Sequence, residues 1–252
     1  MLRTGNPALK ETTFLDLSSG TVVSRDGEAM TLNGTVHRTA VLLFLAVLTA
    51  AFAWNSVAIG PEGPSANFGL YLWGGLIGGL VFAFATIFKP AWSPVTAPLY
   101  ALFEGLFLGA ISALYDARFN GIVLQAVMLT TGTLFALLFA YRSGLIKATE
   151  NFKLGVVAAT GGIALIYLAT IALSFFGIRI PYIHESGLIG IGFSLFVVVV
   201  AALNLVLDFD FIEQGVERGA PKHMEWYGAF GLMVTLVWLY VEFLRLLAKL
   251  RK

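Results

Sequence analysis

Cysteine is absent from the 252 residues of this sequence, and charged side chains are scarce. Without cysteine the chain can form no disulfide bond, no thiolate nucleophile and no cysteine-ligated metal site. The three histidines, His37, His184 and His223, lie far apart and in no spacing typical of a zinc site. A net charge of +1, with no basic stretch carrying interleaved aromatics, also gives no indication of nucleic-acid binding.

Apolar residues dominate what is present. They make up 58% of the chain, and the mean hydropathy is +0.84. Charged residues make up 12%, about half of the roughly 25% expected of a soluble domain. The first strongly apolar run begins only near Thr39, after a polar segment, so we expect no cleaved signal peptide. The composition therefore predicts a polytopic membrane protein.

Seven segments are long and apolar enough to cross a bilayer, which takes about 20 residues each. We place them at residues 39–59, 68–88, 97–115, 121–141, 154–176, 187–207 and 226–247. The connections are short and contain glycine or proline, so they predict antiparallel neighbours in one compact all-α bundle. The predicted organisation is a polar cytoplasmic N-terminal segment, residues 1–38, followed by a seven-helix transmembrane domain, residues 39–252.

The distribution of lysine and arginine predicts the orientation. Ten of them lie in the N-terminal segment and in the connections on its side, whereas the opposite connections hold only Arg118 and Arg179. Because positive charge is retained on the cytoplasmic side, the N-terminus should be cytoplasmic. The basic C-terminal tail, residues 245–252, conflicts with seven complete crossings, and a re-entrant last segment would remove the conflict.

Three glycine pairs at a spacing of four indicate close helix packing in the second and third spans. Small residues at this spacing let helix backbones approach each other in a membrane. We favour packing within the chain over a dimer contact for the pairs Gly74 and Gly78, Gly75 and Gly79, and Gly105 and Gly109.

Four acidic residues, Glu104, Asp208, Asp210 and Glu242, lie in or at the edge of these apolar runs. An ionised carboxylate is costly there, so each is a functional candidate. One interpretation is that the sixth helix ends before Asp208 and its carboxylates are hydrated. Three carboxylates, including Glu213, would then face the negative end of the helix dipole. This favours a helix that continues toward residues 215–219. Glu104 either faces the same cavity or bonds to a neighbouring helix.

Glu242 has apolar neighbours on both sides, and Arg245 follows three residues later, close enough for an ion pair within the helix. One interpretation is a pair that neutralises itself. The other uses the equal sequence distance of Asp208 and Glu242 from Glu225: a hairpin turning there brings both acids to similar depth. Two carboxyl groups in low dielectric would share a proton or bind a hard cation such as calcium. The predicted pH sensor and cation site is Asp208, Glu242 and Asp210, with Glu104, Glu213 and Arg245 as secondary candidates.

Several motifs together resemble one family. They are ALNLVLDFDFIEQG, the final LYVEFLRLLAKL, YALFEGLFLGAIS in the third span, and NPALKE and MTLNGT near the N-terminus. The chain resembles bacterial members of the Bax inhibitor-1/YccA (TMBIM) family over almost its whole length. The resemblance implies a seven-helix bundle with the last helix central, in the bacterial inner membrane. It also implies a pH-sensitive calcium leak controlled by aspartates on the sixth and seventh helices.

Carried over residue by residue, the sixth-helix aspartate matches Asp208 and the seventh-helix aspartate matches Glu242. Glutamate keeps the charge and adds a methylene. Asp210 replaces an amide-like position of the family and adds a third carboxylate. Calcium, as the permeating or bound ion at these three residues, is what the resemblance implies.

Other functions stay open at this point. Some bacterial relatives are substrates or modulators of the membrane protease FtsH, which would make the N-terminal segment the binding part. Intramembrane acids also serve proton-coupled transporters. We expect no enzyme, because the spans contain no Ser and His pairing and no aspartates in a GxGD-like context.

Overall fold

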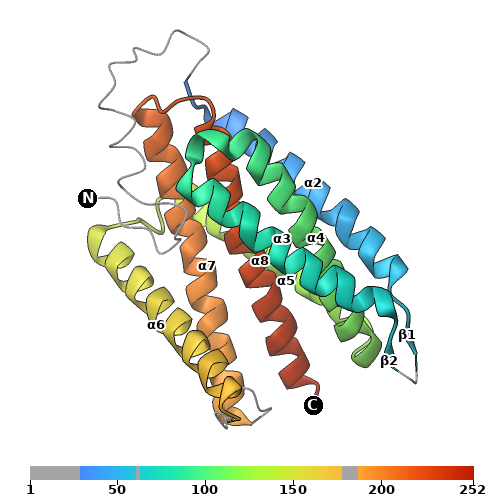
Figure 1. The fold of residues 1–252 in the computed structure, drawn as a ribbon. Coiled ribbons are helices and arrows are strands. Elements are labelled where there is room, and N and C mark those ends of the chain that lie inside the picture. The colour runs from blue at the N-terminus through green and yellow to red at the C-terminus, as the bar shows by residue number, and fades with distance from the viewer. Residues whose placement is uncertain (1–28, 61–62, 178–186) are drawn as a thin grey trace. The chain divides into compact units, whose positions relative to one another are not determined.

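The computed structural model describes residues 29–60, 63–177 and 187–252. Helices dominate, and a short 3-10 helix, η1 (Pro90–Trp92), and a two-stranded hairpin, β1 (Ile59–Gly60) and β2 (Gly63–Pro64), lie between them (Figure 1). The helices are α2 (Leu32–Ser56), α3 (Ala66–Phe88), α4 (Ser93–Arg118), α5 (Ile122–Arg142), α6 (Glu150–Phe175), α7 (Leu188–Glu217) and α8 (Met224–Leu250). In the described part of the chain, all seven are long and apolar enough to cross a membrane, which confirms the predicted class. Most of the predicted N-terminal segment, residues 1–28, lies outside the described residues.

Two helix ends differ most from the predicted spans. α2 begins at Leu32, not Thr39, because the hydroxyl of Thr31 caps the helix by accepting a hydrogen bond from the Gly34 amide at 2.9 Å. α7 continues to Glu217. Gly219, two residues later, has a φ of 64°, which is typical of the glycine that terminates a helix. The continuation past Asp208 that the dipole argument favoured is confirmed.

The chain forms two compact units where the short connections predicted one bundle. The first contains Ile122–Asp210 and Thr235–Lys252, and the second contains residues 29–121 and Phe211–Val234. The boundary between them therefore falls inside α7 and inside α8.

In the second unit, glycines let α4 pack closely on α2 and α3. A Cβ on Gly75 would lie 2.5 Å from the Phe107 amide nitrogen, and one on Gly105 or Gly109 would collide with carbonyl oxygens of α2. Gly74 differs, since nothing lies within 4 Å of a Cβ there. The paired glycines thus serve packing within the chain, as predicted, with Gly74 as the exception.

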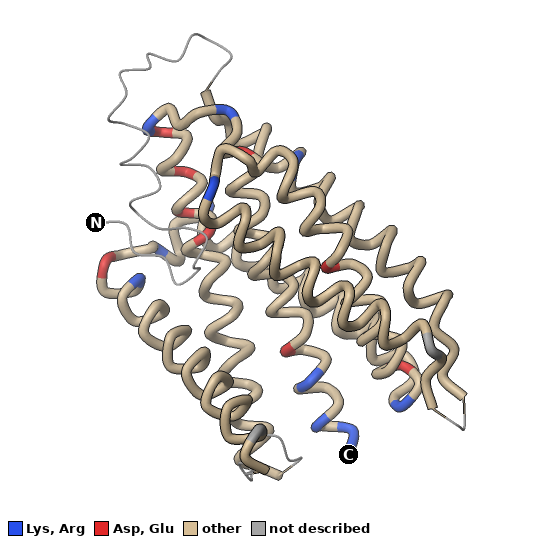
Figure 2. Tube along the Cα trace, viewed as in Figure 1, with Lys and Arg blue, Asp and Glu red and all other residues tan. Residues whose placement is uncertain are grey.

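In the first unit, side chains of α6, α7 and α8 enclose an apolar cluster. Ile163, Val197 and Val200 are buried, and Trp238 packs against them. α8 has the largest share of buried residues of the seven helices, as expected of a central helix. Its 27 residues form one uninterrupted helix, about 40 Å long. The re-entrant last segment is therefore wrong, and the basic residues gather at the end of a full-length helix (Figure 2).

Candidate functional site

Glu242 is a buried carboxylate held by one cation and one hydroxyl. It lies eighteen residues after the start of α8 at Met224, and its side chain is 1% exposed. Its Oε1 accepts hydrogen bonds from Arg245 Nη1 at 2.8 Å and from the Tyr167 hydroxyl of α6 at 3.0 Å. The Arg245 guanidinium also lies 5.4 Å from the centroid of the Tyr167 ring. The predicted ion pair of Glu242 with Arg245 is confirmed, with Tyr167 as a third member.

The second oxygen of Glu242 is available. Oε2 is buried and makes no hydrogen bond within the described part of the chain. An ionised carboxylate can accept bonds at both oxygens, and an unused buried acceptor is costly. The Glu242 site therefore has capacity for a proton or a cation.

Asp208 does not reach the depth of Glu242. Lys249 of α8 donates hydrogen bonds to the Gly190 carbonyl at 2.9 Å and to the Ser194 hydroxyl at 2.8 Å, which sets the register of α7 against α8. Glu242 precedes Lys249 by seven residues, and the two helices run in opposite directions. Glu242 is therefore level with the part of α7 about seven residues after Gly190 and Ser194. Asp208 lies about 10–16 Å further along the α7 axis. The prediction of similar depth is wrong, because the hairpin turns near residue 220 and not at Glu225.

Asp208 lies in a polar patch of α7 that contains a neighbour missed by the sequence analysis. Its side chain is fully buried. Asn204, one turn earlier on the same face, donates to the Thr160 hydroxyl of α6 at 2.8 Å. The Oδ1 of Asn204 is buried and makes no hydrogen bond to any described residue. This patch offers oxygen atoms near Asp208, separate from the Glu242 site.

Asp210 forms an ion pair with Lys153, which lies just before the predicted span at residues 154–176. Lys153 of α6 is buried, and its ammonium lies 2.8 Å from Asp210 Oδ2 and 3.4 Å from Glu150 Oε1. α6 begins at Glu150, four residues earlier than predicted, and so brings Lys153 into the helix. The charge of Asp210 is therefore balanced by the Lys153 ammonium.

The remaining acids lie in the second unit. Glu104 of α4 is 9% exposed and packs against α3, where a Cβ on Gly79 would lie 2.8 Å from its Oε2. Glu104 therefore lies beside a neighbouring helix, and its predicted hydrogen bond to that helix stays a prediction. Glu213 is exposed near the end of α7.

The predicted calcium site of Asp208, Asp210 and Glu242 is not formed. Among the described residues, no group of three or more His, Asp or Glu side chains is placed to hold a metal ion. Asp208 and Asp210 are two residues apart on one helix and cannot point to the same side. The offset of Glu242 along α8 removes the third ligand.

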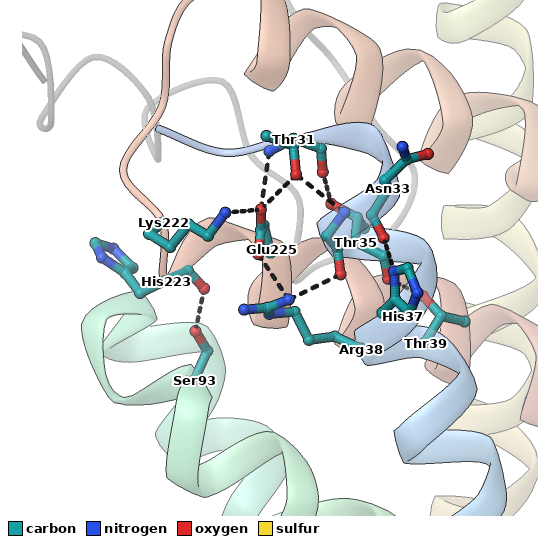
Figure 3. A network of polar contacts seen from close by, with 11 residues as sticks. Thr31, Asn33, Thr35, His37, Arg38, Thr39, Ser93, Lys222, His223 and Glu225 are labelled. Carbon is teal, nitrogen blue, oxygen red and sulfur yellow. Dashed lines mark hydrogen bonds and ion pairs between the residues drawn. The ribbon is translucent and has the colours of Figure 1, made fainter. Parts of the chain in front are cut away.

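A fourth buried acid, Glu225, forms a network in the second unit (Figure 3). Its side chain is fully buried and lies 2.9 Å from Arg38 and 2.8 Å from Lys222. It also accepts bonds from the Thr31 amide at 3.0 Å and the Thr31 hydroxyl at 2.8 Å. Gly34 has no side chain, and a Cβ there would collide with the carboxylate. No local pattern marks this network, since Thr31 and Glu225 are 194 residues apart in sequence.

With this geometry established, comparison with known proteins gives one family. The model of the Bax inhibitor 1 like family matches residues 6–252, nearly the whole chain. The chain belongs to the Bax inhibitor 1 like family. No curated protein and no solved structure matches it. Glu242 and Asp208 are thus buried acids of a Bax inhibitor 1 like membrane protein, each with its own surroundings.

Proposed function

We propose that this protein is a pH-sensitive cation leak channel that conducts calcium and is gated by protonation of carboxylates within the membrane. The supporting observation is Glu242, a carboxylate 1% exposed and deep in a spanning helix. Ionisable groups at such depth are typical of ion and proton paths. Membership of the Bax inhibitor 1 like family agrees with this function.

At Glu242 a proton and a cation compete for the same oxygen atoms. Protonation removes the negative charge and turns one oxygen into a donor. The carboxyl group then attracts neither Arg245 nor a passing cation. The side chains that contact Glu242 are those of Tyr167 on α6 and Arg245 on α8, and Lys249 on α8 interacts with it electrostatically. Asp208 contributes as a second, separate acid nearer the α7 terminus.

The test is calcium flux into liposomes containing the purified protein, measured from acidic to alkaline pH. We expect flux through the wild type that changes with pH, and loss of that pH response in Glu242→Gln. Asp208→Asn should change the response independently of Glu242→Gln, because the two sites are apart. Glu217→Gln, an exposed position at the end of α7, is the matched control. Absence of flux in the wild type, or an unchanged response in Glu242→Gln, contradicts the proposal.

Two other functions would give different results in the same preparation. A partner of a membrane protease would lose its binding when residues 1–30 are deleted, whereas a channel would still conduct. A proton-coupled transporter would show saturable uptake of a solute. We also propose that the protein lies in a bacterial inner membrane with its N-terminus in the cytoplasm, which is the orientation that the lysine and arginine distribution favours.

A further inference from the structure

Arg245 is placed to control access to Glu242. It lies one turn beyond Glu242 on α8, and its side chain is 42% exposed while that of Glu242 is buried. The guanidinium binds Oε1 and leaves Oε2 without a hydrogen bond among the described residues. A guanidinium that bonds to both oxygens of a carboxylate forms the stronger, geometrically fixed pair. Here the guanidinium binds one oxygen of the carboxylate, and the arginine side chain is partly exposed.

The Tyr167 ring is a second contact of the Arg245 guanidinium. The guanidinium lies 5.4 Å from the ring centroid, within the range of a cation–π contact. The Tyr167 hydroxyl also donates to the oxygen that Arg245 binds. Arg245 therefore contacts both the ring and the carboxylate, and the Tyr167 hydroxyl binds the same carboxylate oxygen.

We propose that Arg245 is a tethered cation that competes with calcium for Glu242 and sets the affinity of this site. The inference rests on the proposed cation conduction and adds what regulates it. A divalent cation at Oε2 would lie close to the guanidinium, and like charges in a buried site repel strongly. Calcium must displace Arg245 from the carboxylate or bind weakly beside it. Removing the positive charge of Arg245 should strengthen calcium binding, and removing Glu242 as well should cancel the gain.

The chain offers a matched control for this charge. Arg251 is an exposed arginine just after the end of the same helix, and its guanidinium donates to the Gln125 amide oxygen at 2.8 Å. Arg251→Gln removes the same charge from the same end of α8 without altering the Glu242 carboxylate. It separates the effect of contact with Glu242 from that of net charge.

The experiment is a calorimetric titration of the detergent-purified protein with calcium alone. We expect Arg245→Gln to bind calcium roughly tenfold more tightly than the wild type, Arg251→Gln to match the wild type, and the double variant with Glu242→Gln to lose the gain. Arg245→Met keeps the aliphatic packing and replaces Arg245→Gln if the latter does not fold. Unchanged affinity in the folded Arg245 variant, or an equal gain in Arg251→Gln, overturns the inference. The proposed conduction fails separately, by absence of flux in wild-type liposomes.

Discussion

Replacing Glu225 with glutamine should destabilise the protein strongly, although it only exchanges one carboxylate oxygen for an NH₂ group. The buried carboxylate lies 2.9 Å from Arg38 and 2.8 Å from Lys222, and it accepts two bonds from Thr31. The amide NH₂ of glutamine would face a cation or another donor in place of an acceptor. Both cations would also lose their buried counter-charge.

The magnitude follows from the exposure of the partners. Breaking a buried ion pair from one side costs about 3–5 kcal/mol. The side chains of Arg38 and Lys222 are 26% and 44% exposed, so both recover part of their hydration. We therefore expect the lower end, about 3 kcal/mol, which corresponds to a fall of about 6–12 °C in Tm for a chain of this size.

The assay is thermal unfolding of the detergent-solubilised protein, followed by circular dichroism. Glu217→Gln removes an exposed carboxylate near the same connection and should leave Tm unchanged. Gly34→Ala should lower Tm as Glu225→Gln does, because its Cβ would collide with the same carboxylate. If Glu225→Gln unfolds at the temperature of Glu217→Gln, the network does not stabilise the fold and the reasoning is refuted.

Two further predictions concern stability. Burial lowers the pKa of His223 below its usual 6.5. Between the lowered pKa and 6.5 the unfolded chain binds more protons than the folded chain, so the free energy of unfolding should rise with pH over this range. His223→Phe should flatten this part of the Tm-against-pH curve, and a slope equal to that of the wild type would contradict the prediction. Gly75→Ala should lower Tm through collision with the α4 backbone. Gly74→Ala, with open space around its Cβ, should raise Tm slightly through helix propensity, and equal shifts in both variants would exclude close packing at Gly75.

The number and type of spans could be predicted because a bilayer demands about 20 apolar residues for each helix. The continuation of α7 past Asp208 was predictable as well, because three carboxylates at a helix C-terminus are unfavourable. The ion pair of Glu242 with Arg245 followed from spacing on one helix. These are local properties, and each can be read from a short stretch of sequence.

The site geometry depended on information that the sequence does not carry locally. The depth of Asp208 relative to Glu242 is set by where the hairpin turns, and the assumed centre at Glu225 was several residues too late. Lys153 was assigned to a connection because α6 starts earlier than its apolar run. The Glu225 network depends on contacts with the first helix, which no periodicity in either segment indicates.

The absence of native cysteine makes the separation of Asp208 and Glu242 directly measurable by disulfide cross-linking. As a positive control, cysteines at Thr86 and Thr96, whose short side chains are hydrogen-bonded to each other at 2.7 Å, should cross-link readily under mild oxidation. Cysteines at Asp208 and Glu242 should not, because about 10–16 Å along the helix axis separates them. Efficient cross-linking of Asp208→Cys with Glu242→Cys would contradict the separate sites and restore a shared pair of acids.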